Sequence, residues 1–410
     1  MEQILILGAG TAGTMAANML DKRLGGSHAI TVVDQDEVHY YQPGFLFLPF
    51  GTYGPDDVVK PKRSFLRKGV RYTSGAIEEL DPVKQTVALA DGTMLDYDHL
   101  IIATGTHPNP NETPGLESDE YGKTIHDFYT FEGAMALRES MANFRNGRIV
   151  MNLIEMPIKC PVAPLEFVFL ADSFFTELGV RDKVEIVYVT PMGGVFTKPV
   201  ASELLGDMFT ERNIHLEPDF YLERVDADEK RLVSYDERQV DYDLLVTVPI
   251  NMGAEFVAKA GIGDELNHVT VDKGNFQSPD YPNIFAIGDA AALPTSKAGS
   301  VAHFAMDTFI PNFVEYLDGK PMTHTFDGHA NCYIETGNEK AMLIDFNYEH
   351  EPVGGHFPGA VGLPLMKESR MNHLGKLMFQ PFYWHGLLAG RDIPGIGHDT
   401  PTAGKHAVPN

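Results

Sequence analysis

Short apolar runs alternate along the chain with stretches in which apolar residues recur at helical spacing. The apolar runs are ILIL at 4–7, AITVVD at 29–34, HLII at 99–102, RIVMNLI at 148–154 and NIFAI at 283–287. Short runs of this kind, bounded by glycine or polar residues, are typical of strands that are buried on both faces. Helical stretches follow two of them, at 14–24 and 165–175. The pattern therefore predicts an α/β fold built on parallel sheets.

The first apolar run leads into a glycine-rich turn. In ILILGAGTAG, Gly8, Gly10 and Gly13 fill the G-x-G-x-x-G pattern. In that pattern the glycines allow a tight turn, a close approach of the backbone to a pyrophosphate and the packing of the helix on the strand. The second run ends in Asp34, 21 residues past Gly13, where an acid that binds a ribose is expected. We therefore predict that this part of the chain binds a dinucleotide.

Two later segments resemble the flavin-binding segments of flavoproteins with two dinucleotide domains. They are YDHLIIATGTHP at 97–108 and PNIFAIGDAA at 282–291. In such proteins the Gly-Asp turn places a carboxylate at the ribitol and a helix N-terminus near the inner phosphate. The resemblance implies FAD as the cofactor. The residues that it assigns to the cofactor here are Thr104, Gly105, Gly288, Asp289 and Lys297.

The order of these segments predicts an interrupted domain. A chain of 410 residues is long enough for two or three domains. We expect a disulfide-reductase-like flavoprotein with two Rossmann-like domains and a C-terminal region that faces a membrane and a quinone. The predicted divisions are 1–110 and 243–320 for the two parts of the FAD-binding domain, 111–242 for the inserted second Rossmann-like domain, and 321–410 for the C-terminal region with its flexible tail.

The strand at 148–154 invites a second dinucleotide motif, but the turn after it contains no glycine. Glu155, Met156, Pro157 and Ile158 occupy the turn instead. Without glycine the backbone cannot come close to a pyrophosphate. We therefore predict that the inserted domain has no NAD(P)H site and that the flavin has another electron donor.

Cys160 is the candidate for this role. Pro161 and Pro164 stiffen the turn that holds it, and a helical stretch follows. A cysteine just before a helix N-terminus is favoured as a thiolate, and Lys159 would add to this effect if its ammonium points inward. Glu166 is close enough in sequence to shuttle protons for the thiol.

At this point the sequence resembles a known family. The pattern P-x-K-C-P-x-A-P-x-E at 157–166 is similar to the cysteine turn of the sulfide:quinone oxidoreductases and of the related flavoprotein of flavocytochrome c sulfide dehydrogenase. The resemblance covers nearly the whole chain in order. Its other segments are HYYQPG at 39–44, SKAGSVAHFAM at 296–306, FDGHANCYIETG at 326–337, which contains Cys332, and MFQPFYWHGLLAG at 378–390.

The resemblance implies an enzyme that oxidises hydrogen sulfide with FAD. Cys160 and Cys332 would form a redox pair, bridged by a disulfide or a polysulfur chain, and Glu166 would move protons. Hydrosulfide would attack the bridge, the released thiolate would reduce the flavin, and the sulfur would leave as sulfur or polysulfide. Many members carry a third cysteine near 120–130, where this chain has His126 and Asp127. A thioether link to FAD through that residue is therefore excluded.

The electrons would then pass to a membrane quinone. A quinone ring is flat and apolar, so aromatic and aliphatic walls suit it. The candidates are Tyr333, Ile334, Phe346, Phe379, Tyr383 and Trp384.

Charge changes this picture at one place. The chain as a whole has a formal charge of −25, which argues against nucleic acid as a partner. The segment 365–391 instead carries Lys367, Arg370, Lys376 and Arg391 against Glu368 alone, interspersed with apolar residues. Such a segment is typical of a peripheral membrane face. We find no signal peptide and no run long enough to cross a bilayer, so we expect a protein on the cytoplasmic side of a membrane.

Other interpretations remain open. In one alternative, the enzyme passes its electrons to a cytochrome or a soluble sulfur carrier instead of a quinone. In another, the protein is a non-catalytic redox sensor that uses its flavin and thiols as a switch. A type II NADH dehydrogenase is disfavoured by the missing glycines. The chain has 16 histidines but no ligand spacing, so no metal is expected, and a homo-oligomer is left open.

Overall fold

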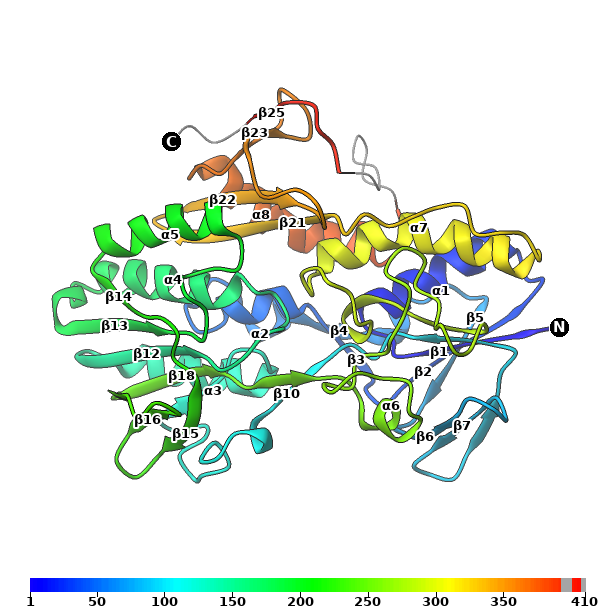
Figure 1. Cartoon of the computed structure of the whole chain (residues 1–410), viewed down its shortest axis with the longest axis horizontal. Coiled ribbons are helices and arrows are strands. Elements are labelled where there is room, and N and C mark those ends of the chain that lie inside the picture. Colours follow the sequence, from blue (N-terminus) through cyan, green and yellow to red (C-terminus); the bar gives the residue numbers. More distant parts are fainter. Residues whose placement is uncertain (392–399, 407–410) are drawn as a thin grey trace.

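The computed structural model describes residues 1–391 and 400–406 and contains two five-stranded parallel sheets (Figure 1). The first sheet has the order β20-β9-β1-β2-β5, made of β1 (Gln3–Leu7), β2 (Ala29–Asp34), β5 (Val70–Ser74), β9 (His99–Ile102) and β20 (Ile284–Ala286). The second has the order β11-β18-β12-β13-β14, made of β11 (Ile125–His126), β12 (Gly147–Leu153), β13 (Val184–Val189), β14 (Ile214–Glu217) and β18 (Leu244–Val248). The expected α/β fold with two Rossmann-like units is confirmed.

The apolar runs form these sheets because each strand is buried on both faces. In β1, Ile4 and Ile6 belong to the large central core, whereas Leu5 and Leu7 belong to a second core on the opposite face. Helix α1 (Thr11–Leu24) packs on the first face and ends at Gly25, whose φ of 57° lies in the left-handed region. The continuous hydrophobic run is thus what a parallel sheet requires.

Two neighbouring chain segments connect the first unit to the inserted unit. Strand β10 (His107–Asn109) leads out of the first unit and pairs antiparallel with β19 (Ile250–Met252), which leads back. Strand β18 pairs with β12 and so completes the inserted sheet. The predicted division at 242 therefore falls one strand too early, because the sequence from 244 to 248 reads as a strand without showing which sheet it joins.

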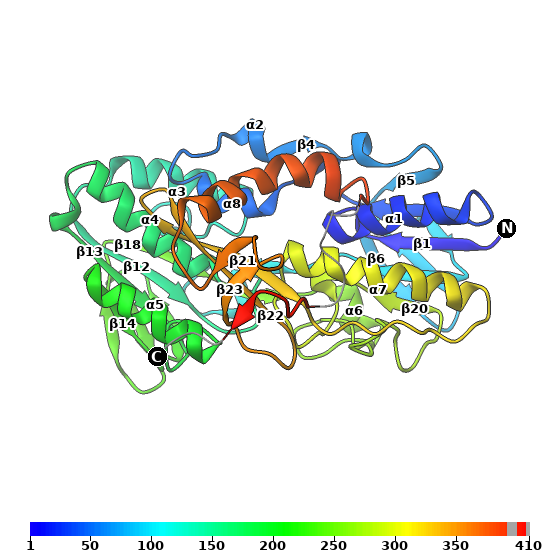
Figure 2. The ribbon, with the colours of Figure 1, turned by 90° about the horizontal axis from the view of Figure 1, so that it is seen from above.

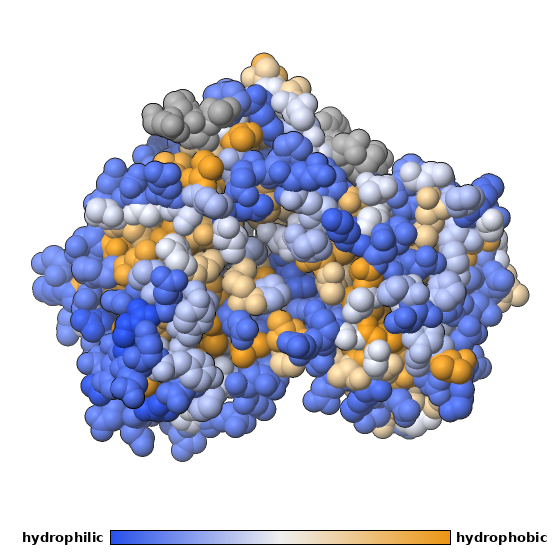
Figure 3. Space-filling model, viewed as in Figure 1, coloured by the Kyte–Doolittle hydropathy of each residue, from blue (hydrophilic) through white to orange (hydrophobic). Residues whose placement is uncertain are grey.

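Helices and small sheets cover the two units. The remaining helices of the inserted unit are α3 (Phe131–Asn143), α4 (Ala163–Glu177) and α5 (Pro199–Glu211). The shorter elements are β3 (Val38–Tyr40), η1 (Gln42–Phe47), α2 (Pro55–Val58), β4 (Val59–Pro61), β6 (Ile77–Asp81), β7 (Thr86–Leu89), β8 (Met94–Asp96), β15 (Leu222–Asp226), β16 (Arg231–Ser234), β17 (Gln239–Asp241) and α6 (Glu255–Lys259). The face in Figure 3 is largely hydrophilic, with scattered apolar patches and an indentation between the two lobes at its lower edge.

The C-terminal part packs over the junction of the two units. Strand β21 lies against α4 of the inserted unit and against α7 (Gly299–Leu317) of the first unit. In Figure 2, α8 runs beside α2 and β4. The elements here are β21 (Ala330–Gly337), β22 (Lys340–Phe346), β23 (Gly354–Phe357), β24 (Leu363–Leu365), α8 (Arg370–Phe382), a π-helical turn at Tyr383–Leu387, and β25 (Lys405–His406).

Part of the tail is held by this sheet, contrary to the expectation of a flexible segment. Strand β25 pairs with β23, and the Lys405 ammonium lies 2.6 Å from an oxygen of the buried Asp345. The Thr400 hydroxyl donates to Asp327 at 2.7 Å. The small polar composition of 400–406 gave no sign of these contacts, which depend on carboxylates far away in sequence. Residues 397–399 and 407–410 of the predicted tail lie outside the described residues.

Candidate functional site

The glycine turn between β1 and α1 forms one end of a long cavity. Gly8 has a φ of 96°, and a Cβ there would lie 2.5 Å from the carbonyl oxygen of Ala103. Gly13 packs its backbone against Gly8, as the motif requires. Gly10 lines the cavity instead, and no protein atom lies within 4 Å of the position of its missing Cβ. Gly8 and Gly13 thus permit the fold of the turn, and Gly10 leaves room for a ligand.

Asp34 lies at the end of β2, beside this turn. Its Oδ2 accepts a hydrogen bond from the backbone N–H of Ala9 at 2.6 Å, and its Oδ1 lies 2.7 Å from the Lys62 ammonium. The carboxylate is therefore fixed at the wall of the cavity, where the motif expects a contact with a ribose. Lys62 is buried next to it and had no recognisable signal in the sequence.

The cavity has a volume of about 550 Å³, within the range of cofactor sites, and it passes between the two units. Gly105 and Gly299, like Gly10, line it with no atom of the described residues near the missing Cβ, and the buried Thr104 hydroxyl has no partner in that part of the chain. These open positions fit an extended dinucleotide. The predicted cofactor residues that line the cavity are Gly8, Gly10, Asp34, Thr104, Gly105, Gly288, Asp289 and Lys297.

Lys297 has a supporting position in this wall. Its ammonium donates to the carbonyl oxygens of Asp289 at 2.7 Å and of Ala291 at 3.1 Å. It therefore holds the Gly-Asp turn in place. Burial raises the pKa of Asp289, although the nearby lysines oppose this.

Cys160 occupies the turn that corresponds to the glycine turn in the other unit. Strand β12 holds the same place in its sheet as β1, and the β12–α4 turn is the counterpart of the β1–α1 turn. The turn places Cys160 in the cavity wall, with a φ of 46°, and its backbone N–H donates to the Lys297 carbonyl at 2.7 Å. The missing second fingerprint is thus replaced by a cysteine that reaches the first unit.

The electrostatics of Cys160 differ from the expectation. Burial and the neighbouring Glu166 carboxylate raise the pKa of the thiol to about 12. The helix begins at Ala163, and the Lys159 ammonium donates to Gln42 at 3.2 Å. The structure with two free thiols therefore does not have the predicted stabilisation of a Cys160 thiolate, because desolvation of the buried sulfur outweighs the effect of the helix N-terminus.

Glu166 lies on the first turn of α4 and faces both the cavity and the C-terminal helix. Its Oε1 accepts hydrogen bonds from the Glu335 backbone N–H at 2.6 Å and from the Lys376 ammonium, while its Oε2 is buried without a partner among the described residues. Burial raises the pKa of Glu166 to about 7, against the opposing effect of Lys376. A carboxyl group in a cavity wall whose pKa lies near neutral pH is suited to accept and release protons.

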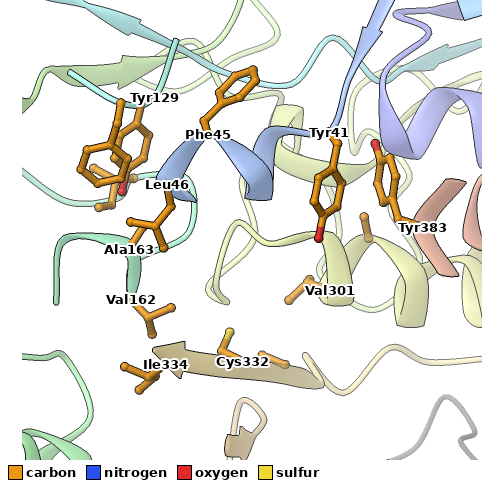
Figure 4. Packing of buried hydrophobic residues seen from close by; sticks show 14 of the residues in the cluster. Tyr41, Phe45, Leu46, Tyr129, Val162, Ala163, Val301, Cys332, Ile334 and Tyr383 are labelled. Atoms are coloured by element: carbon orange, nitrogen blue, oxygen red, sulfur yellow. The ribbon is translucent and has the colours of Figure 1, made fainter. Parts of the chain in front are cut away.

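Cys332 approaches the same place from β21. In Figure 4 its sulfur points away from the strand, toward the space bordered by Val301 and Tyr41. Both cysteines are free thiols. Burial is the main cause that raises the pKa of Cys332, and the second is the charge of Cys160, so the two thiols interact. The structure thus brings together the three residues predicted to be catalytic.

The six predicted quinone residues do not form one group. Tyr383, Phe379 and Trp384 surround Tyr41 of the HYYQPG segment, with ring centroids 4.9, 6.4 and 6.1 Å from it. The Tyr383 hydroxyl, at the cavity wall, is 2.7 Å from the Thr11 hydroxyl and 2.6 Å from His39 Nε2. Burial lowers the pKa of His39 to about 3, so this histidine is neutral.

The other three candidates lie elsewhere. Ile334 and Phe346 are buried in the central core. Tyr333 packs with Leu343 and Leu365 on the opposite face of the sheet. Neighbouring residues of a strand point to opposite faces, so Tyr333 and Ile334 could not line one site. Adjacency in sequence was a misleading signal here.

The basic segment 365–391 differs in one respect from the membrane face predicted from the sequence. The Lys376 side chain points inward to Glu166, and Arg370 pairs with Glu339 at 3.2 Å. The other predicted bases, Lys367, Arg370 and Arg391, are exposed. One side of α8 adds apolar residues to this surface, because Met371, Leu374 and Met378 are 59, 58 and 65% exposed. The surface therefore combines bases with methionine and leucine as predicted, but without Lys376.

The segment without the third cysteine is a structural turn. Asp127 accepts hydrogen bonds from the backbone N–H groups of Tyr129 and Thr130, both at 2.7 Å, in the turn before α3, whose N-cap residue is Thr130. His126 is buried and lies 2.9 Å from the Ser140 hydroxyl. No group of three or more metal-ligating side chains occurs in residues 1–391 or 400–406. In the same ranges no helix has the length and apolarity needed to cross a bilayer.

The comparisons with known proteins agree with this arrangement. The pattern of the pyridine nucleotide-disulphide oxidoreductase family matches residues 2–142. The chain is 28% identical to a mitochondrial sulfide:quinone oxidoreductase of Dictyostelium discoideum, over 95% of this chain and 86% of that protein. It is 25% identical to the mouse protein of the same name, again over 95% of the chain and 86% of the relative.

A solved structure shows the same fold. The sulfide:quinone oxidoreductase of Aquifex aeolicus superimposes with a TM-score of 0.81 at 22% identity, over 95% of this chain and 92% of that one. FAD is the cofactor that the glycine turn, the open cavity and these relatives assign to the chain. By sequence over nearly its whole length, the chain is a flavin-dependent oxidoreductase and a homologue of the sulfide:quinone oxidoreductases.

Proposed function

We propose that this protein oxidises hydrogen sulfide to sulfur or polysulfide through Cys160 and Cys332 and passes the electrons to a membrane quinone. One observation carries the proposal. The wall of the dinucleotide cavity includes Cys160 and Glu166, while Cys332 interacts with Cys160 from β21. The thiols therefore lie where a bound flavin is within reach. The names of the full-length relatives support the same substrates.

The thiol chemistry follows from this pair. In the oxidised state the two cysteines form a bridge, and hydrosulfide attacks one of its sulfurs. The attack forms a sulfur–sulfur bond to that cysteine, breaks the bridge and leaves the other cysteine as a thiolate. The persulfide and the thiolate then close a bridge that is longer by one sulfur, which releases two electrons and one proton. FAD bound in the cavity would supply the two-electron chemistry that connects this step to the acceptor. We leave open which cysteine is attacked.

Glu166 is the group that takes the proton of the incoming sulfide. Its Oε2 has no partner within the described chain, and its pKa of about 7 allows both protonation states near neutrality. The Lys376 ammonium holds the other oxygen and stabilises the charged form. Lys376 also lines the cavity, so its charge is available to the thiolate as well.

The acceptor site lies at the other end of the same wall. Tyr383 lines the cavity beside Tyr41 and Phe379. Tyr41 directly precedes η1, Phe379 lies on α8, and Tyr383 begins the π-helical turn after it. We place the quinone ring among them and the membrane against the outer face of α8, on the cytoplasmic side. Tyr333, Ile334 and Phe346 have no part in this site. A homo-oligomer remains a prediction.

An anaerobic titration tests the proposal. Sulfide added to the FAD-loaded protein should bleach the flavin absorbance, while NADH should leave it unchanged because the β12–α4 turn cannot cradle a pyrophosphate. Quinone added to the reduced protein should restore the colour. Rapid bleaching by micromolar NADH would refute the proposal. Bleaching by sulfide without reoxidation by any quinone would instead assign a cytochrome or a soluble sulfur carrier as the acceptor.

A further inference from the structure

A second pair of a carboxylate and a base, Glu335 and His373, lies between β21 and α8, beside the Glu166–Lys376 pair. Glu335 follows Cys332 on β21 and is 1% exposed, and its carboxylate accepts a hydrogen bond from His373 Nδ1 at 2.9 Å. The His373 side chain is 18% exposed. Of these two residues, His373 is therefore the one that touches solvent.

The two pairs are linked through one helix and one strand. His373 and Lys376 are three residues apart on α8, so their side chains lie on neighbouring positions of the same face. His373 holds Glu335, and Lys376 holds Glu166. The backbone N–H of Glu335 donates to Glu166 at 2.6 Å. The charges of both carboxylates raise the pKa of Lys376 against its burial, so the ammonium couples them.

This arrangement matters because sulfide oxidation produces protons in a buried place. Hydrogen sulfide that becomes zero-valent sulfur gives up two electrons and two protons. Bound FAD would take up the electron pair and one of these protons. One proton must therefore leave the thiol cavity in each reductive half-reaction.

We propose that Glu166, Lys376, Glu335 and His373 form the proton outlet of the thiol cavity and that His373 is its exit to solvent. The inference rests on the proposed sulfide oxidation and adds a route for its proton. Glu166 receives the proton from the thiol cavity. The Lys376 ammonium balances the charges of the two carboxylates, and the Glu335–His373 pair exchanges the proton with water. His373 acts through Glu335, so it is a positioning and relay residue rather than a catalytic one.

Other titratable side chains interact with Glu166 or Glu335. Tyr41, Tyr129 and Cys332 are buried, whereas Tyr53 and Cys160 are partly exposed. On the adjoining side, Arg212 is held by Glu368 at 2.8 Å and by the carbonyl of Thr336. Two members of the cluster touch solvent, since the His373 side chain is 18% exposed and the Lys376 side chain is 12% exposed. Although burial opposes it, the two carboxylates raise the pKa of Lys376, so its ammonium keeps its proton near neutral pH, where an imidazole can exchange one.

The test measures flavin bleaching and proton release in the same stopped-flow shot. The FAD-loaded protein is mixed with sulfide at mildly acidic pH, in weak buffer with an indicator dye. In the His373→Gln variant, proton release should slow by about 10²-fold, the usual scale for loss of a proton-transfer group. Added imidazole should restore the rate. A Glu335→Gln variant should be equally slow but should not respond to imidazole, because its defect is buried.

The matched control is His385→Gln. His385 is exposed on the turn after α8 and belongs to neither pair, so its loss should leave proton release unchanged. Thermal unfolding and alkylation of the two thiols report whether each variant retains the fold and the cavity. Proton release from His373→Gln at the wild-type rate would overturn the outlet. Absence of bleaching in the wild-type protein would overturn the proposed function instead.

Discussion

Cys160 and Cys332 are 172 residues apart in sequence and come from different elements, and Cys160 lines the cavity. One lies in a turn that follows β12, and the other lies on β21 and points out of the C-terminal sheet (Figure 4). Neither is required to form the cofactor cradle. The cofactor contacts and the thiol chemistry are therefore separable by substitution at single residues.

We expect Cys160→Ser and Cys332→Ser to bind FAD normally and to lose bleaching by sulfide. Serine is nearly isosteric but cannot form or exchange a sulfur–sulfur bond. Flavin absorbance of the purified variants measures cofactor content, and anaerobic mixing with sulfide measures the reaction. If either variant reduces quinone with sulfide at a rate close to that of the wild type, the redox pair is misassigned.

Glu166 makes a prediction about pH. Burial raises its pKa from 4.5 to about 7, so the carboxylate that accepts a proton is present above about pH 7 and lost as the pH falls. Bleaching by sulfide should therefore rise with pH through this value in the wild type. Glu166→Gln should be slower by about 10²-fold and should lack the inflection. Retention of the inflection in the variant would assign the titration to another group, or to the substrate.

At the scale of elements, α8 serves two sides of the molecule. Its inner face carries His373 and Lys376, which bind carboxylates, and Phe379, which packs near Tyr41. Its outer face carries the exposed residues Met371, Leu374 and Met378. Reversal of Lys376 would therefore damage the thiol site, and a test of membrane binding has to use the outer face.

We expect Leu374→Glu combined with Met378→Glu to weaken binding to anionic vesicles by at least about tenfold, because two apolar side chains lose their transfer free energy into lipid. Bleaching by sulfide should be unchanged. Co-sedimentation at low and high salt measures the binding. The control is Val83→Glu with Met94→Glu, two exposed apolar residues of the small β6-β7-β8 region. Equal binding by both double variants would remove α8 as the docking surface.

At the scale of the whole molecule, two sheets of the same strand order have different functions. The turn after the central strand of the first sheet is open at Gly10, while the corresponding turn of the second contains Cys160 and no glycine before it. The C-terminal sheet then lies over the junction and adds Cys332. One nucleotide site and one thiol site thus occupy equivalent positions.

This difference predicts a selective stabilisation. FAD bound at the junction should raise the thermal unfolding midpoint of the apoprotein, with a gain of about 2.7 kcal/mol at a free concentration one hundred times the Kd. NADH at the same concentration should give no shift. Differential scanning fluorimetry of the apoprotein with each nucleotide makes the comparison. A comparable shift with NADH would show that the inserted unit binds a nucleotide after all.

The sequence determined what depends on neighbours along the chain. The apolar runs specify strands because a parallel sheet buries both faces, and the glycines at 8 and 13 specify a turn that larger residues cannot form. The absence of glycine from 155 to 160 likewise removes a pyrophosphate site locally. These features, and the resemblance of the cysteine turn, sufficed for the fold, the cofactor and the candidate thiols.

Only the tertiary structure decided what depends on distant partners. The pKa of Cys160 is raised because packing buries it beside Glu166, and Lys376 points inward because a buried carboxylate attracts its charge. Tyr333 and Ile334 separate because strand alternation sends them to opposite faces. Desolvation and charge pairing act through space between elements that are remote in sequence, so no local pattern of residues could specify them.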